Sequence, residues 1–241
     1  MEKPAAFERK HVETDQGPDG HSGQGIRVAV MDEILSKRII AIMRGIEPKS
    51  CITLARALWE GGIHLIEVTF DQKDPATFHD TARAIQAIQE DPGCGALVGA
   101  GTVTTPGLVD LAAEAGAKYI VSPDTNPHVI ARTLENGLVS IPGAMTPTEI
   151  MAAHNLGADF VKLFPVSQLG IDYIKAICAP ISHVKLLATG GVNEENITGF
   201  IRAGAVGAGV GGNLVNKAWI AEGRFDRITA LAKELVTAVD F

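Results

Sequence analysis

Short apolar runs alternate with longer segments of helical periodicity over most of this chain. Eight runs have the length of a strand, and they lie at residues 39–43, 64–70, 96–100, 118–122, 138–141, 160–164, 184–188 and 206–210. Segments of helical period, such as 48–60, 75–90, 106–115 and 146–154, lie between them. This alternation is typical of a parallel sheet built from βαβ units. The pattern therefore predicts eight parallel strands connected by helices.

Glycine-containing pairs mark the ends of several predicted helices, at 61–62, 116–117, 157–158 and 204–205. Helices commonly end on a left-handed residue, and glycine adopts that conformation without strain. Eight βα units in one chain favour a single closed (β/α)8 barrel, the TIM barrel. An open doubly wound sheet is the competing architecture, but no GxGxxG motif follows the first predicted strand.

The start of the chain differs from the rest. Residues 1–25 are polar, glycine-rich and without periodicity, so we expect a poorly ordered extension to which no function is assigned. Apolar residues then recur at helical spacing, at Val28, Val30, Met31, Ile34 and Leu35. This spacing predicts a short N-terminal helix over 26–37 that leads into one barrel domain, residues 26–241.

Composition narrows the class of protein. Hydrophobic residues make up 46% and charged residues 20%, as in ordinary globular domains. The formal net charge of -7 argues against a nucleic-acid partner, because phosphate binding needs a basic surface. No apolar run approaches the roughly 18 residues of a membrane helix, so we expect no membrane partner. Cys51, Cys94 and Cys178 show no CxxC spacing, which fits a reducing cytoplasm.

Lys162 interrupts the apolar run 160–164, where it shares a face with Phe160 and Phe164. An ammonium group is costly to desolvate. Burial therefore favours the neutral amine, which attacks carbonyl carbons and forms a Schiff base. The alternative is a lysine whose head group reaches water along its stem. Lys118 and Lys185 lie instead at strand starts, where charge usually serves stability.

Glu67 is a second ionisable residue within an apolar run. Its parity with Leu65 and Thr69 predicts that it points into the barrel. A carboxylate beside a Schiff-base lysine can transfer the protons of bond cleavage. The alternative is a structural Lys–Glu ion pair.

The carboxyl ends of barrel strands form the active site in this fold. The residues at those ends include Arg44, Thr102, Pro123, Phe164, Gly190, Gly191, Gly212 and Asn213. The glycines lie after the seventh and eighth predicted strands, where barrels often bind phosphate through backbone N–H groups. The alternative is that these glycines only form tight turns.

From about Met31 to its C-terminus, the chain resembles the 2-keto-3-deoxy-6-phosphogluconate (KDPG) / 4-hydroxy-2-oxoglutarate (KHG) aldolase family. The matching stretches are GGIHLIEVTF, VGAGTVTTP, AKYIVSPDTNP, SIPGAMTPTEI, ADFVKLFPVSQLG, LLATGGVNEENI and AGVGGNLV. The resemblance implies a homotrimeric class I lyase that acts on small 2-keto acids and needs no metal or other cofactor. It releases pyruvate, together with glyceraldehyde 3-phosphate or glyoxylate.

The resemblance also implies a role for each matching residue. Lys162 is the Schiff-base lysine and Glu67 is the acid/base residue. Thr102 and Pro123 line the pyruvate pocket, and Phe164 packs beside the lysine. The phosphate is held by Gly190, Gly191, Gly212 and the backbone of Asn213.

Two positions depart from the family pattern. Asp71 stands where many members have an arginine that binds the substrate carboxylate. Arg44 can supply that cation instead, because its guanidinium fork matches a carboxylate. Asn213 stands where many members have a serine, and its amide can still donate to phosphate.

Three other functions remain open at this point. A metal-dependent aldolase needs clustered ligands, yet the seven histidines show neither HxH nor HExxH spacing. A sugar-phosphate isomerase or synthase would share the phosphate glycines without an imine on Lys162. A non-catalytic metabolite-binding relative would need neither Lys162 nor Glu67.

Overall fold

A computed structural model describes residues 20–240 of the chain. Helix α1 (Gly20–Lys37) begins earlier than the predicted start at residue 26, and so takes in the end of the predicted extension. The rest of that extension, residues 1–19, lies outside the described residues. The division into an extension and a barrel domain therefore stays a prediction.

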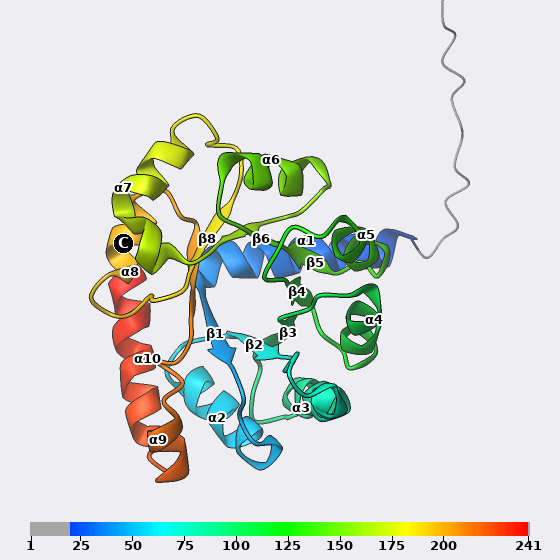
Figure 1. Cartoon of the computed structure of the whole chain (residues 1–241). Helices are drawn as coiled ribbons and strands as arrows, with labels where there is room; N and C mark the ends of the chain where they lie inside the picture. Colours follow the sequence, from blue (N-terminus) through cyan, green and yellow to red (C-terminus); the bar gives the residue numbers. More distant parts are fainter. Residues whose placement is uncertain (1–19, 241) are drawn as a thin grey trace, which may run out of the picture.

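All the strands belong to one parallel sheet that winds into a barrel (Figure 1). They are β1 (Ile39–Met43), β2 (Leu65–Thr69), β3 (Leu97–Gly101), β4 (Tyr119–Val121), β5 (Val139–Ile141), β6 (Gly143–Ala144), β7 (Val161–Leu163), β8 (Leu186–Thr189) and β9 (Gly207–Val210). Their order is β5-β4-β3-β2-β1-β9-β8-β7-β6. The predicted TIM barrel is confirmed.

The predicted strand 138–141 corresponds to β5 alone, and a further short strand, β6, follows it directly after Pro142. Strand β5 pairs with β4, whereas β6 pairs with β7. Proline has no N–H to donate, but the Pro142 carbonyl accepts from the Lys162 N–H at 2.9 Å. The Ser140 carbonyl likewise accepts from the Phe160 N–H at 3.2 Å. The chain thus crosses from one edge of the sheet to the other and closes the barrel.

The helices surround the sheet (Figure 1). They are α2 (Pro48–Glu60), η1 (Pro75–Thr77), α3 (Phe78–Gln89), α4 (Pro106–Glu114), α5 (Pro127–Glu135), α6 (Pro147–Asn155), α7 (Val166–Cys178), α8 (Ile197–Arg202), α9 (Lys217–Ala221) and α10 (Phe225–Val239). Several begin with proline after a capping side chain, as Thr105 caps α4 and Thr146 caps α6. Four of the predicted terminating glycines, Gly62, Gly116, Gly157 and Gly204, have positive φ.

The sheet separates two cores. The larger core fills the space between strands and helices. The smaller one fills the barrel interior with side chains such as Leu65, Tyr119, Phe160 and Leu187, together with Val30 and Ile34 of α1. Helix α1 therefore covers the amino-terminal end of the barrel and leaves the other end for ligands.

A bidentate ion pair holds α1 in this place. Arg27 Nη2 lies 2.7 Å from Oδ1 of Asp159, and Arg27 Nε lies 3.1 Å from Oδ2. Oδ2 of Asp159 also accepts the backbone N–H of Ser140 at 2.9 Å.

Within residues 20–240, no helix combines the length and the apolar character that a bilayer crossing requires.

Candidate active site

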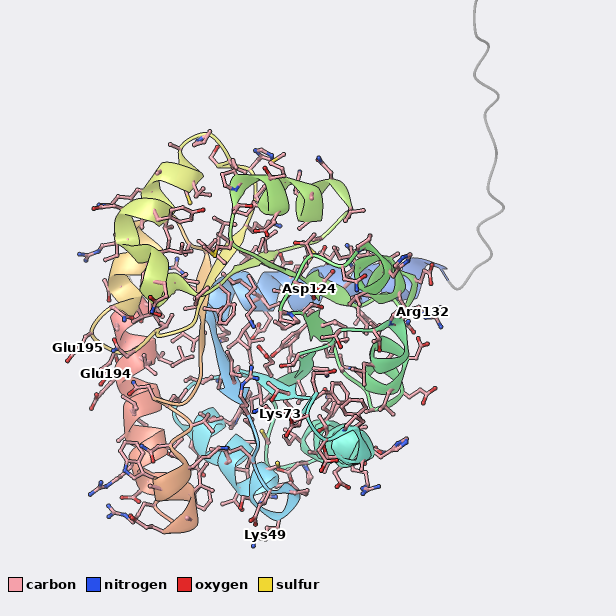
Figure 2. All side chains as sticks on the ribbon, in the orientation of Figure 1. Lys49, Lys73, Asp124, Arg132, Glu194 and Glu195 are labelled. Carbon is pink, nitrogen blue, oxygen red and sulfur yellow. The ribbon has the colours of Figure 1, made fainter. Side chains whose placement is uncertain are left out.

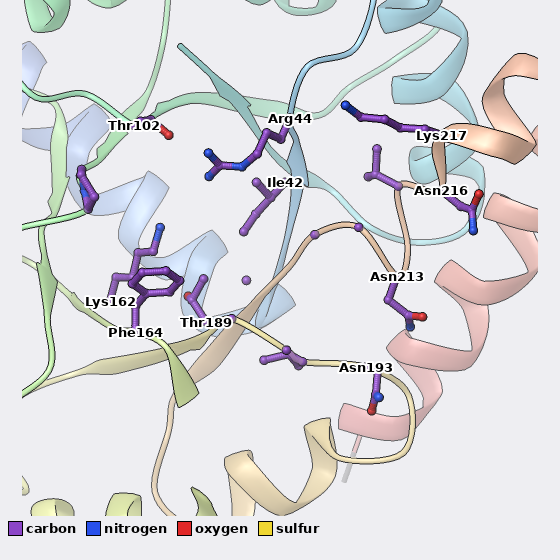
Figure 3. Close-up of a pocket in the computed structure, with 18 of the residues that line it drawn as sticks. Ile42, Arg44, Thr102, Lys162, Phe164, Thr189, Asn193, Asn213, Asn216 and Lys217 are labelled. Carbon is purple, nitrogen blue, oxygen red and sulfur yellow. The ribbon is translucent and has the colours of Figure 1, made fainter. Parts of the chain in front are cut away.

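A cavity of about 850 Å³ opens at the carboxyl ends of the strands (Figure 3). It is lined by Lys162 and by every predicted substrate-binding residue: Arg44, Thr102, Pro123, Phe164, Gly190, Gly191, Gly212 and Asn213. These residues come from several βα units that are distant in the sequence, and closure of the barrel brings them together. Glu67 does not line this cavity but lies buried within the barrel.

Lys162 projects from β7 into the cavity but has little contact with solvent, with an exposed fraction of 6%. Its Nζ lies 5.2 Å from the centre of the Phe164 ring, within range of a cation–π contact. None of the ion pairs among residues 20–240 involves Lys162. Lys162 and Glu67 therefore lie farther apart than ion-pair distance, although the charge of Lys162 still acts on the carboxyl group. The lysine head group does not extend into bulk water.

Glu67 occupies space that β3 leaves vacant. A Cβ built on Gly101 would collide with Oε1 of Glu67, so glycine is required at that position for this placement of the carboxyl group. The Glu67 side chain is 2% exposed, and burial raises its pKa because it disfavours the charged form. The positive charges of Lys162 and Arg44 oppose that rise in pKa. A carboxyl group whose pKa is raised above its ordinary value is suited to donate and accept protons.

Arg44 follows β1, and its guanidinium group reaches into the cavity from the side opposite Asn193 (Figure 3). Asp71, the residue at the position of the family arginine, lines a separate, smaller hollow next to α2 and α3. Its Oδ1 accepts the backbone N–H of Lys73 at 2.9 Å, which forms a local turn. Asp71 therefore does not line the space where a substrate carboxylate would meet Arg44.

Thr102 lies at the end of β3 in a strained backbone conformation, with a φ of 55°. Its carbonyl accepts a hydrogen bond from Nε2 of Gln72 at 2.9 Å. Non-glycine residues in this region of φ tend to occur at functional sites, where the surrounding structure holds them. The surrounding structure therefore holds Thr102 in this conformation at the edge of the cavity.

The glycine-rich turns form the other end of the cavity. Gly190 and Gly191 have φ values of 92° and 78°, which other residues rarely adopt. A Cβ at Gly212 would meet open space, so its backbone is accessible from the cavity. The Asn213 side chain also has a partner within the protein, since its Nδ2 donates to Oε2 of Glu194 at 2.5 Å. The Asn213 amide is thus engaged by a carboxylate, and Glu194 lies at the outer edge of the molecule (Figure 2).

Comparison with known proteins places this site in a family. The family model described as KDPG and KHG aldolase matches residues 30–231. The chain belongs to this family. It is therefore an aldolase, a lyase that acts on a carbon–carbon bond.

Relatives of this aldolase agree with the assignment. The 2-dehydro-3-deoxy-6-phosphogalactonate aldolase of Escherichia coli (strain K12) is 36% identical over 83% of this chain and 96% of its own length. The 2-dehydro-3-deoxy-phosphogluconate aldolase of Treponema pallidum (strain Nichols) is 34% identical over 88% of this chain and 98% of its own. These relatives support the aldolase interpretation and not the isomerase or synthase alternative.

A solved structure of KDPG aldolase from Legionella pneumophila contains pyruvate captured at low pH as a covalent carbinolamine intermediate. It is 27% identical to this aldolase, with a TM-score of 0.73, over 88% of this chain and 97% of that one. The roles of individual residues in the present chain stay predictions.

Sequence reasoning missed several residues that line the cavity of this aldolase. Asn193, Asn216 and Lys217 belong to segments beyond the strand ends, so a search limited to those ends does not reach them. One of the three had a signal in the sequence, because asparagine is a preferred N-cap residue. Asn216 caps α9, and its Oδ1 accepts the backbone N–H groups of Ala218 and Trp219.

The space that Gly101 leaves for Glu67 generates a test. We expect Gly101→Ala to lower the kcat of aldol cleavage by about 10²-fold, because a displacement of about 1 Å of a reacting group has an effect of that size. Gly107→Ala is the matched control, since a Cβ there meets no atom within 4 Å. Equal kcat values for the two folded variants would contradict the importance of this placement.

Proposed function

We propose that this aldolase cleaves 2-keto-3-deoxy-4-hydroxy acids, and above all those with a 6-phosphate, through a Schiff base on Lys162. Two side chains support this proposal. Lys162 borders the cavity with an exposed fraction of only 6%, and the Glu67 carboxyl group is buried in the same barrel with a raised pKa. The E. coli and T. pallidum relatives are named for different sugar acids, which both belong to this chemical class.

Cleavage begins when Nζ of Lys162 attacks the C2 carbonyl carbon of the substrate. The resulting carbinolamine loses water and becomes an iminium, which draws electrons from the neighbouring carbon atoms. The carbinolamine in the Legionella relative supports this first step.

Glu67 then accepts the proton of the C4 hydroxyl group, directly or through a water molecule. The C3–C4 bond breaks, its electron pair moves toward the iminium, and the aldehyde product leaves. The enamine that remains takes up a proton at C3, which Glu67 returns. Water then hydrolyses the new iminium, so that pyruvate is released and the Lys162 amine is restored.

Substrate binding divides between the two ends of the cavity. The Arg44 guanidinium pairs with the C1 carboxylate, while Thr102 and Pro123 enclose the pyruvate part of the substrate and Phe164 packs beside the lysine. At the other end, Gly190, Gly191, Gly212 and the Asn213 N–H hold the phosphate through backbone donors.

The aldolase acts, in this proposal, as a homotrimer in the cytoplasm. Cys51, Cys94 and Cys178 are free thiols, which fits a reducing compartment. Light scattering at micromolar concentration is expected to give three times the molar mass of the chain. A monomer or dimer mass under the same conditions would contradict the trimer.

Borohydride reduction in the presence of pyruvate tests the Schiff base. We expect one reduced three-carbon adduct on Lys162, identified by peptide mass spectrometry, because borohydride reduces an iminium to a stable amine. Lys185→Ala should trap pyruvate as the unaltered chain does, since Lys185 lies at the start of β8. An isomerase would give no adduct, and an adduct on another lysine would reject the role of Lys162.

Two substrates separate the carboxylate and phosphate contacts. We expect a lower KM for the phosphorylated keto acid than for unphosphorylated 4-hydroxy-2-oxoglutarate. Arg44→Ala should raise both KM values by about tenfold or more, because both substrates present the same carboxylate to the guanidinium. Unchanged KM values in this variant would reject the Arg44 contact, and an equal KM for the two substrates in the unaltered chain would reject the phosphate site.

A further inference from the structure

Two buried polar atoms inside the barrel have no hydrogen-bond partner among the described residues. They are Oε1 of Glu67 and the hydroxyl oxygen of Tyr119. The Tyr119 side chain has an exposed fraction of 0%, and that of Glu67 is 2%. Because nearly all buried polar groups in proteins are hydrogen-bonded, two such atoms in one small interior need an explanation.

Both side chains lie over the same strand. Strand β3 runs between β2, which carries Glu67, and β4, which carries Tyr119. A Cβ built on Gly99 would collide with the Tyr119 ring, just as one on Gly101 would collide with the Glu67 carboxyl group. Gly99 and Gly101 are two residues apart, so they face the same side of the sheet. Two glycines thus leave room on one face of β3 for two side chains that come from the strands on either side of it.

The surroundings leave few other partners for either atom. The Tyr119 ring belongs to the apolar inner core, with neighbours such as Leu65, Val121 and Phe160. The charges that act on Glu67 are those of Lys162 and Arg44, and the charge that acts on Tyr119 is that of Glu67. Burial together with the Glu67 charge raises the pKa of Tyr119 well above its ordinary value, against a smaller lowering effect of the Gly99 backbone. The Gly99 backbone does not reach hydrogen-bonding geometry with the hydroxyl, which stays protonated and able to donate.

We infer that Tyr119 is a positioning residue for Glu67, and that its hydroxyl group donates a hydrogen bond to the carboxylate, directly or through one buried water. Tyr119 does not line the cavity, and so it acts on the substrate only through Glu67. The inference rests on the proposed role of Glu67 as the base of aldol cleavage. Lys162 and Arg44 then act on the carboxylate from the cavity, and Tyr119 acts on it from within the barrel.

The Tyr119 hydroxyl, as a hydrogen-bond donor, should lower the pKa of Glu67. A hydrogen bond to the carboxylate favours its charged form and so offsets part of the rise in pKa that burial causes. Removal of the hydroxyl should raise the pKa of Glu67 further. Since cleavage uses the charged form, the acid limb of the profile of kcat against pH should move to higher pH.

Tyr119→Phe tests the inference, because phenylalanine keeps the ring and removes only the hydroxyl. We expect the acid limb of kcat to move up by about one pH unit, which is about a tenfold loss of kcat on that limb. The plateau at higher pH and the KM should change little. A thermal unfolding scan would establish that the variant is folded.

Tyr173→Phe is the matched control, since it also removes a phenol hydroxyl. That hydroxyl donates to the Met145 carbonyl at 2.6 Å and does not line the cavity, so the profile should stay in place. A folded Tyr119→Phe variant whose acid limb does not move would overturn the inference, as would a uniform loss of kcat at every pH, which marks a merely structural role. Glu67→Gln separates the two proposals: if that variant keeps full activity, the base assignment itself fails, whatever Tyr119 does.

Discussion

Desolvation of two ionisable side chains is the constraint on which the rest of this structure depends. Lys162 and Glu67 are held inside a closed sheet, where an unpaired ion costs on the order of several kcal/mol. The barrel tolerates them because the Lys162 head group borders the cavity and the Phe164 ring, while the Glu67 carboxyl group experiences positive charge from two residues. The same closure of the sheet that forms the barrel therefore also shields Lys162 and Glu67 from water.

Glycine residues are a second structural requirement of this site. Strand β3 carries glycine at positions 99 and 101, and the space above it is filled from the neighbouring strands by Glu67 and Tyr119. In the turns after β8, Gly190 and Gly191 adopt backbone conformations that bulkier residues avoid. Glycine positions therefore shape both the barrel interior next to Glu67 and the turns that line the cavity.

Much of the fold could be read from the sequence, because hydrophobic periodicity reports local geometry directly. The segments 39–43 and 48–60 coincide with β1 and α2. The segment 138–141 did not reveal β6, since a two-residue strand after proline has no periodicity to detect. The start of α1 was missed for a related reason, because polar residues at a helix end leave no apolar spacing.

The candidate site could be predicted from the sequence where an ionisable residue interrupts an apolar strand, as Lys162 and Glu67 do. It was not predictable where a contact depends on distant segments. The Asn213 amide meets Glu194 only because two successive loops lie side by side, and this contact has no signal in the sequence. Tyr119 resembles any buried aromatic residue until the fold places it opposite Glu67.

The ion pair between Arg27 and Asp159 has a consequence for the order of assembly. Its partners are 132 residues apart, and Asp159 also binds the backbone of Ser140 where the barrel closes. During synthesis, α1 leaves the ribosome long before Asp159 is made, so Val30 and Ile34 wait without the surface they finally cover. The first helix of the chain can therefore complete its ion pair only after most of the barrel has been made.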